Sequence, residues 1–299
     1  AGIADVAALT KDSAYMKVID RIFENIVGKK YYLTGGVGAC HDGEAFGDNY
    51  ELPNMTAYNE TCAAISMVYL FERMFLLHGE SKYIDCLERT LYNGVISGMS
   101  MDGGRFFYPN PLSSDGKYAF NADNTKTRQP WFGCACCPSN LCRFIPSVPG
   151  YLYGVKDNNI YVNLFAGNTS TIKVNGKDVV LEETTEYPWN GDIKIAVKKS
   201  GVKNANLLVR IPGWVRNQVV PSDLYKYSDA EKPAYTVTVN GKAVEADLDA
   251  NKGYLPVKNI KKGDVIRIHF DMPVRTVIAN GKVADDKGKV AVERGPLVY

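Results

Sequence analysis

The stretch NETCAAISMVYLFERMFLLHG, residues 59–79, decides how the first half of this chain folds. Its apolar side chains recur at helical spacing, and Gly79 stands where a helix of this length would stop. The stretch therefore predicts one long helix. Its first residues have a different character, because Glu60 and Cys62 stand two positions apart at the helix entry, before the apolar run begins.

Two further segments with helical periodicity flank this helix. DSAYMKVIDRIFENIVGKK, residues 12–30, begins with Asp12 or Ser13 as a cap, and SKYIDCLERTLYNGVISGMS, residues 81–100, begins with Ser81 as a cap. Helices joined by short turns are typical of antiparallel α-hairpins. Residues 1–150 are therefore expected to be helical, with two long loops rich in Gly, Pro and Asn between the hairpins.

The second half follows a period of two, which indicates β-strands. Apolar and polar residues alternate in several runs: 159–174, 191–199, 204–215, 234–244 and 263–274. The tripeptide Asn-Gly-Lys occurs at 175–177, 240–242 and 280–282, and Asn-Gly is a strong hairpin signal because both turn residues need positive φ. Residues 151–299 therefore predict antiparallel β-sandwich structure in one or two sub-domains, with His269 on its surface.

Composition excludes several classes of protein. The chain has 299 residues, of which 45% are hydrophobic and 23% charged, as in ordinary globular domains. A net charge of +2 gives no reason to expect nucleic acid as a partner, and the absence of any run of about 18 apolar residues predicts no membrane span. The first residues read as the middle of a helical domain and the last as an unfinished strand, so we expect a chain truncated at both ends.

The cysteines point to metal chemistry without proving it. There are seven, all in the first half: Cys40, Cys62, Cys86, Cys134, Cys136, Cys137 and Cys142. The stretch WFGCACCPSN, residues 131–140, places three of them within four positions. If Glu60 and Cys62 turn inward together, they could join Cys136 and Cys137 as four tetrahedral ligands of a zinc ion. Spacing alone leaves two alternatives open, which are buried free thiols and disulfides.

The first long loop offers an acid. HDGEAFGDNYELP, residues 41–53, holds the carboxylates Asp42, Glu44, Asp48 and Glu51 beside Phe46 and Tyr50. A glutamate near apolar rings can have its pKa raised and serve as a general acid. The same composition also suits a solvated acidic loop, so the residues leave both interpretations open.

At this point the chain resembles a known family. The segments 32–63, RFFYPNP at 105–111 and WFGCACCPSN at 131–140 together resemble glycoside hydrolase family 127, the β-L-arabinofuranosidases, and its close relative family 146. RIPGW at 210–214 and VAVERGPLVY at 290–299 agree with the β-domains of that family. The resemblance covers essentially the whole chain.

The resemblance implies an α+β multidomain fold. Residues 1–150 would be the C-terminal part of an (α/α)6 toroid, and residues 151–299 would be the antiparallel β-sandwich region. It also implies a Zn²⁺ site formed by Glu60, Cys62, Cys136 and Cys137. Cys136 would double as the nucleophile, Glu44 would be the acid/base, and Tyr108 would contact the sugar. Cys134 belongs to the motif without being a ligand, and Cys40, Cys86 and Cys142 are expected to be buried thiols.

The implied activity is that of a retaining glycoside hydrolase. It would release β-L-arabinofuranose from plant-type glycans or glycoproteins, through the zinc-bound Cys136 and the acid/base Glu44. In the family, further substrate-binding histidines come from helices that precede this segment, and the location, cytoplasmic or periplasmic, and the oligomeric state stay open. Two rival functions are a zinc-stabilised carbohydrate-binding protein without catalysis, and a sugar epimerase on the same toroid. Epimerases of that type rely on paired histidines, whereas this chain has only His41, His78 and His269.

Overall fold

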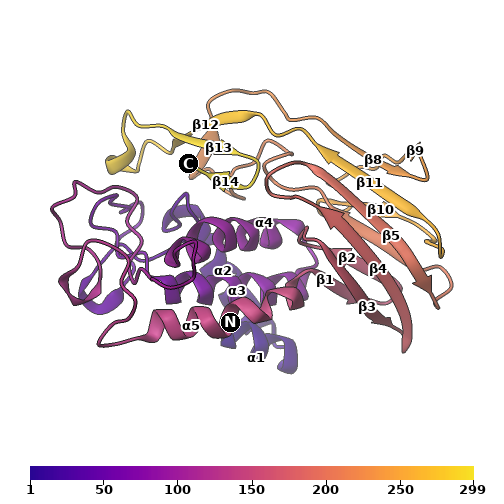
Figure 1. Ribbon diagram of the computed structural model, residues 1–299, viewed down its shortest axis with the longest axis horizontal. Helices are drawn as coiled ribbons and strands as arrows, with labels where there is room; N and C mark the ends of the chain where they lie inside the picture. Colours follow the sequence, from indigo (N-terminus) through magenta and orange to yellow (C-terminus); the bar gives the residue numbers. More distant parts are fainter.

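Helix α3, Thr61–His78, lies at the centre of the helical half and packs against α1, α4 and α5 (Figure 1). The computed structural model describes all of residues 1–299. The predicted helix and its stop are confirmed, because Gly79 takes a left-handed φ of 66° and its N–H donates to the carbonyl of Phe75. Ten of its 18 residues are buried: Thr61, Ala64, Ile65, Met67, Val68, Leu70, Phe71, Glu72, Met74 and Phe75. A helix that is buried on most sides gains its stability from packing.

The other α-helices are α1 (Gly2–Thr10), α2 (Ser13–Lys29), α4 (Ser81–Arg89) and α5 (Cys136–Phe144). Short helices are η1 (Asp42–Glu44) and η4 (Ala122–Asn124) in the loops, η5 (Ile145–Tyr151) directly after α5, and η6 (Ala284–Asp286) in the sheet half. Asp12 caps α2, because its Oδ1 accepts a hydrogen bond from the N–H of Ala14 at 2.8 Å. This confirms one of the two caps that the sequence offered.

The third predicted helix differs from the expectation in two ways. Glu80 occupies the N-cap position, and Ser81 Oγ instead accepts a hydrogen bond from Arg216 Nη2 at 3.0 Å, so the predicted cap is wrong. The α-helix also ends at Arg89 and continues as a π-helix, η2 (Thr90–Val95), and a 3₁₀ turn, η3 (Ile96–Gly98). The loop at Gly35 packs directly on this turn, because a Cβ there would lie 2.5 Å from the Cα of Thr90.

Fourteen strands follow the helices and form three sheets. The first sheet has the order β1-β2-β6-β10, formed by Tyr153–Lys156, Asn159–Val162, Asn206–Arg210 and Tyr254–Val257. The second has the order β3-β4-β5-β11-β8-β9, formed by Asn168–Val174, Lys177–Thr185, Asp192–Ser200, Val265–Phe270, Tyr235–Val239 and Lys242–Ala243. The third has the order β14-β13-β12-β7, formed by Leu297–Val298, Ala291–Arg294, Val274–Ala279 and Tyr225–Tyr227. The chain is thus a multidomain arrangement of helices and sheets whose ladders are antiparallel except one.

Turn chemistry sets part of the strand register. Asn175 and Gly176 have φ of 48° and 77°, and they close the β3–β4 hairpin as the Asn-Gly signal predicts. Asn240 and Gly241 close β8–β9 in the same way. The third Asn-Gly-Lys does not form a two-residue hairpin; the amide of Asn280 donates instead to the carboxylate of Asp223 at 3.1 Å. The pairing of β2 with β6 is parallel, so the expectation of purely antiparallel sheets is wrong at that one ladder.

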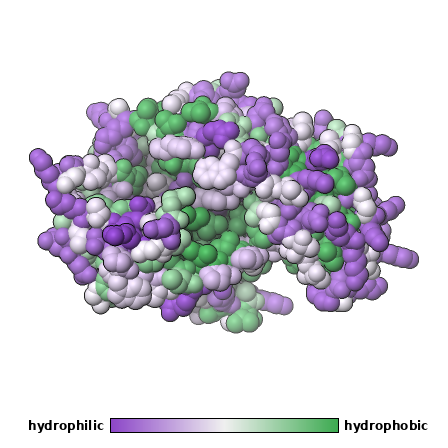
Figure 2. Space-filling model, in the orientation of Figure 1, coloured by the Kyte–Doolittle hydropathy of each residue, from purple (hydrophilic) through white to green (hydrophobic).

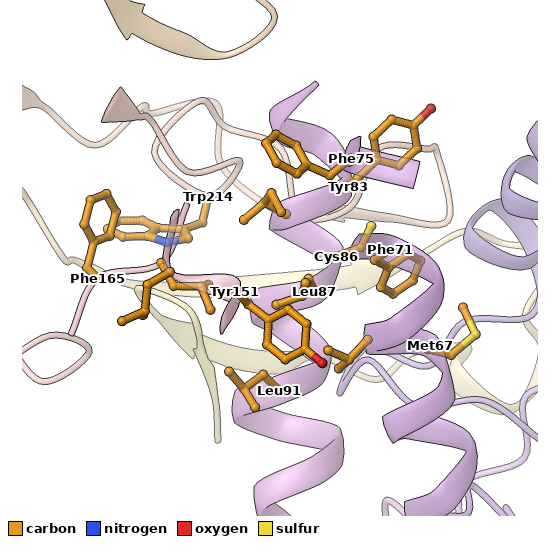
Figure 3. Packing of buried hydrophobic residues seen from close by; sticks show 14 of the residues in the cluster. Met67, Phe71, Phe75, Tyr83, Cys86, Leu87, Leu91, Tyr151, Phe165 and Trp214 are labelled. Carbon is orange, nitrogen blue, oxygen red and sulfur yellow. The ribbon is translucent and has the colours of Figure 1, made fainter. Parts of the chain in front are cut away.

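A buried ion network joins the sheets to the helices. Arg210 at the end of β6 is fully buried and pairs with Asp85 at 2.8 Å and with Glu88, both on α4. The hydroxyl of Tyr187 donates to the Glu88 carboxylate at 2.9 Å. Figure 3 shows the apolar packing beside this network, where Phe165 and Trp214 of the sheet half approach the helical side chains. The charges are satisfied by one another, which is the condition for placing them in a core.

The third sheet attaches to the helical half through polar contacts. Arg89 pairs with the buried carboxylate of Glu293 on β13, and the hydroxyl of Tyr227 donates to the same carboxylate at 3.0 Å. The hydroxyl of Tyr225 donates to the carbonyl of Tyr31 at 3.0 Å. Figure 1 accordingly shows β12–β14 lying over α4. These contacts tie the end of the chain to the segment that carries the loops 31–60.

Apolar side chains remain exposed on the first helices. Figure 2 shows them at the lower edge of the molecule, where α1 lies in Figure 1. Ile3 and Val6 are each 38% exposed and Leu9 is 84% exposed. Helix α3 is the one helix long and apolar enough, by length and composition alone, to cross a membrane, and half of that window is buried inside the protein. Core helices pass the same test, so the absence of a membrane span stays a prediction.

Replacing Arg210 by methionine should destabilise the protein strongly. The variant leaves the carboxylates of Asp85 and Glu88 without their buried partner, which typically costs about 3–5 kcal/mol in the free energy of unfolding. Lys198→Met is the control, because Lys198 and Glu182 form an exposed pair at 3.4 Å, and its loss is worth roughly 0.5 kcal/mol or less. Urea unfolding measures both. Equal losses in the two variants would contradict the importance of the Arg210 network.

Candidate metal centre and acid loop

The four residues proposed as ligands converge on one point. One ligand atom from each of Glu60, Cys62, Cys136 and Cys137 lies within 4.8 Å of all the others. Glu60 Oε1 lies 3.3 Å from Cys137 Sγ and 3.8 Å from Cys136 Sγ, and the two sulfurs are 4.0 Å apart. Tetrahedral zinc with Zn–S bonds of about 2.3 Å would space its ligand atoms roughly 3.7 Å apart. The donor set and its spacing therefore fit a thiophilic metal ion.

Two helix N-termini meet at this cluster. Glu60 is the N-cap residue of α3 and Cys62 lies in its first turn, while Cys136 and Cys137 are the first two residues of α5. The free N–H groups and the dipole of a helix N-terminus favour negative charge, so both helices favour carboxylate and thiolate here. Pro138 lies in the first turn of α5, where its missing N–H costs nothing.

Burial and mutual contact work against ionisation of three of the four groups, Glu60, Cys136 and Cys137. Burial raises the pKa of Glu60, and burial raises the pKa of Cys136 to about 11. The hydrogen bond between Cys137 and the Cys62 sulfur raises the pKa of Cys137, and burial is the second cause of this rise. The same hydrogen bond lowers the pKa of Cys62. Without a cation, the fully ionised form of the cluster is therefore unfavourable. A bound cation would stabilise it and lower the pKa values again.

A paired segment brings Tyr108 to the cluster. The N–H of Thr61 donates to the carbonyl of Tyr108 at 3.0 Å, and the amide of Asn110 donates to Thr61 Oγ1 at 2.9 Å. The N–H of Tyr108 donates to the buried Asn121 Oδ1 at 2.8 Å. The Tyr108 hydroxyl consequently lies 2.7 Å from Cys136 Sγ, and its ring meets Phe132 edge to face at 5.9 Å. The side chain proposed to contact the sugar thus touches the sulfur proposed as nucleophile.

Glu44 occupies an unusual backbone position on the acid loop. It ends the short helix η1 with φ of 50°, a left-handed value that is uncommon for residues other than glycine. Its side chain is exposed, and its Oε1 accepts a hydrogen bond from the hydroxyl of Tyr58 at 2.6 Å. Phe46, expected to shield it, is 45% exposed. The aromatic contact to the carboxylate therefore comes from Tyr58, which sequence reasoning missed.

The sequence analysis also missed residues that hold the segments carrying Tyr108 and Glu60 in place. Asn110 and Asn121 fix the segment that carries Tyr108, and Asn59 directly precedes Glu60 of the cluster. Gly36 offered a local signal, because a Cβ there would lie 1.7 Å from Asn59 Oδ1 and would force the buried Asn59 side chain to move. Within LTGGVG, Gly36 thus permits close approach to the NETC segment, whereas Gly35 approaches Thr90.

The remaining cysteines and the histidines lie outside the cluster. All seven cysteines are free. Cys134 is exposed and is absent from the set of four. Cys86 is buried as expected and Cys40 is partly buried, but Cys142 is exposed, so the expectation of a buried thiol is wrong there.

The histidines make separate contacts. His41 meets the ring of Tyr58 at 5.0 Å, and His78 contacts Asp20 at 2.9 Å. His269 is exposed as predicted and contacts Asp192, a carboxylate that raises its pKa. None of the three histidines contacts another, so no histidine pair of the epimerase type is formed.

Comparison with known proteins assigns the family. Sequence models described as the GH127 catalytic, middle and C-terminal domains of β-L-arabinofuranosidase match residues 1–150, 159–272 and 274–299. The chain belongs to glycoside hydrolase family 127. The resemblance read from the sequence is confirmed, and the limits of 1–150 and 151–299 for the two predicted regions stay a prediction.

Individual relatives agree with this assignment. A non-reducing end β-L-arabinofuranosidase of Bifidobacterium longum subsp. longum is 36% identical over 308 residues, which cover 100% of this chain and 44% of that protein. A solved structure described as a GH127 β-arabinofuranosidase is 60% identical with a TM-score of 0.93, over 99% of this chain and 45% of that one. A GH127 β-L-arabinofuranosidase from Geobacillus stearothermophilus T6 is 37% identical with a TM-score of 0.87, over the same shares. The chain spans about half the length of these relatives.

The cluster should bind one divalent thiophilic ion per chain. Titration with Co²⁺, followed by its thiolate charge-transfer absorption, is expected to saturate at one equivalent, because three sulfurs and one carboxylate complete a tetrahedral site. Cys62→Ala should weaken binding by at least about tenfold. Cys142→Ala removes an exposed thiol outside the cluster and should bind like the unchanged protein. Equal binding by both variants would contradict the site.

Proposed function

We propose that this chain forms part of a retaining glycoside hydrolase that releases β-L-arabinofuranose from plant-type glycans or glycoproteins. The observation that carries the proposal is the placement of an acid next to the metal-type cluster: Glu44 contacts Tyr58, the ring of Tyr58 lies 6.2 Å from that of Tyr108, and Tyr108 contacts Cys136. A purely structural metal site needs neither an exposed carboxylic acid nor a tyrosine against one of its thiols. The sugar is the one on which the relatives act according to their names.

The proposed cofactor is Zn²⁺, held by Glu60, Cys62, Cys136 and Cys137. Their sulfur-rich donor set and their spacing support it. When bound, the ion would keep the thiols deprotonated at neutral pH, although the protein alone raises the pKa of two of them. The position of the Cys136 sulfur is supported by the Glu60 carboxylate at 3.8 Å and by the Tyr108 hydroxyl at 2.7 Å.

In the proposed first step, Cys136 Sγ attacks the anomeric carbon of the sugar. The carbon–sulfur bond forms as the bond to the leaving oxygen breaks, and the electron pair of that bond goes to the leaving oxygen. Glu44 gives this oxygen a proton, so the alcohol departs neutral. The result is a sugar held covalently on Cys136, with sulfur in the role that a carboxylate plays in most retaining glycosidases.

In the proposed second step, water replaces the thiolate. Glu44, now a carboxylate, takes a proton from the water, whose oxygen bonds to the anomeric carbon as the carbon–sulfur bond breaks. Cys136 returns as a thiolate and Glu44 returns protonated, so atoms and charge balance over the cycle. Two inversions at one carbon give net retention of configuration. Tyr108, which lies against the attacking sulfur, is proposed to contact the sugar in both steps.

For the fold, we propose that helices α1–α5 form one part of an (α/α)6 toroid in the whole protein. The exposed apolar residues of α1, Ile3, Val6 and Leu9, support this, because a toroid would give that face a neighbouring helix. The β-sheets would then form the domains that follow the toroid, with residues 151–299 as the sandwich region. The stated sugar and fold both apply to the protein of which this chain is a part.

Two substitutions test the proposed roles on an aryl β-L-arabinofuranoside. Cys136→Ser should lower kcat by at least about 1,000-fold, since the hydroxyl is a poor nucleophile at neutral pH. Glu44→Gln should lower kcat on a methyl glycoside by about 100- to 10,000-fold. On a glycoside whose leaving group needs no proton, it should slow the first turnover much less, and later turnovers should stay slow because the second step lacks its base.

Cys134→Ser serves as the matched control, because this exposed thiol lies two positions from Cys136 and outside the cluster. It should keep the activity of the unchanged protein. Near-full activity in Cys136→Ser would overturn the assignment of the nucleophile.

A further inference from the structure

Tyr58 makes the hydrogen bond that holds the Glu44 side chain. Its hydroxyl donates to Glu44 Oε1 at 2.6 Å, and no other hydrogen bond reaches this carboxylate. The Glu44 side chain is exposed, whereas Tyr58 is only 6% exposed. A free glutamate on a surface turn would sample several rotamers, so this single contact decides where the carboxylate lies.

The backbone beneath Glu44 is already fixed. The N–H of Cys40 donates to the carbonyl of Ala45 at 3.0 Å, and the N–H of Ala45 donates back to the carbonyl of Cys40 at 3.1 Å. This closed turn holds Gly43 and Glu44 in left-handed conformations. With the backbone set, the remaining freedom of the acid lies in its side-chain torsions, which the Tyr58 hydroxyl restricts.

Tyr58 is itself tied to the metal-type cluster. It stands two residues before Glu60, and its carbonyl accepts a hydrogen bond from the N–H of Asn110, whose amide also holds Thr61. Its ring meets His41 edge to face at 5.0 Å and lies 6.2 Å from the ring of Tyr108. The Tyr58 hydroxyl therefore links the Glu44 carboxylate to the chain segment that carries Glu60 and Cys62.

We infer that Tyr58 is a positioning residue that sets the Glu44 carboxylate relative to Cys136 by holding Oε1 and leaving Oε2 to exchange the proton. This role rests on the function proposed above, in which Glu44 is the acid/base. With one oxygen occupied by a phenol, the second oxygen is the one presented to the leaving group and then to water. Tyr58 does not touch the sugar; it acts through Glu44.

Leaving-group dependence separates this role from a structural one. In the whole protein, Tyr58→Phe should lower kcat on methyl β-L-arabinofuranoside by about 10- to 100-fold, the worth of one charge-assisted hydrogen bond, with KM changed less than about twofold. On the 2,4-dinitrophenyl glycoside, whose leaving group needs no proton, the first turnover should slow by less than about threefold. Loss of packing would slow both substrates alike.

The matched control is Tyr118→Phe. Tyr118 is 36% exposed and its hydroxyl makes no hydrogen bond, so the substitution removes the same atom without a partner. It should leave both substrates unaffected. Equal losses on the two substrates in Tyr58→Phe, or no loss on the methyl glycoside, would overturn the inference.

A double-mutant cycle with Glu44→Asp gives a second measurement that does not depend on how well one variant folds. Shortening the acid breaks the contact to Tyr58, so adding Tyr58→Phe to Glu44→Asp should cost much less than it costs alone. Additive losses would overturn the inference. If Glu44→Gln lowers the activity but the losses of Tyr58→Phe and Glu44→Asp are additive, the inference about Tyr58 is wrong and the proposed function stands. No effect of Glu44→Gln would refute the proposed function with it.

Discussion

The meeting of two helix N-termini is the constraint on which the rest of this site depends. Helices α3 and α5 come from segments more than fifty residues apart, and their packing brings Glu60 and Cys62 to Cys136 and Cys137. Free backbone N–H groups at both N-termini favour negative charge at the same point. Burial and mutual repulsion oppose that charge. A thiophilic cation would resolve the conflict, which is the reason to expect a metal where three thiols and a carboxylate converge.

The segments that lie against the N-termini of α3 and α5 supply the other residues of the site. The segment 105–111 lies against the entry to α3, which puts Tyr108 on Cys136. The segment before Glu60 carries Tyr58, which reaches Glu44 on its own closed turn. The sheets contribute from a distance. Arg210 fixes α4, and α4 packs on α3, so the sheet half supports the helices without contributing a ligand.

Much of this could be predicted from the sequence, wherever the signal was local. The long helix with its Gly79 stop and the Asn175–Gly176 hairpin depend on a few neighbouring residues, and both are confirmed. The cluster could be anticipated from a motif resemblance. The predictions that failed concern partners that are distant in the sequence. Ser81 accepts a hydrogen bond from Arg216 instead of capping its helix, and β2 pairs with β6 in parallel. The contact of Tyr58 with Glu44 was missed because residue spacing does not reveal it. Exposure of Cys142 likewise depends on which face of α5 packs on α3.

The central claim is that the sugar becomes covalently bound to the Cys136 sulfur during the reaction. Covalent trapping tests this claim most directly. The Glu44→Gln variant of the whole protein would be mixed with 2,4-dinitrophenyl β-L-arabinofuranoside, quenched in acid, digested and mapped by mass spectrometry. The first step needs no acid with this leaving group, while the second lacks its base, so one pentosyl group should accumulate on the peptide of Cys136. A pentosyl group on another residue such as Glu60, or a burst of dinitrophenol with an unmodified Cys136, would contradict the account.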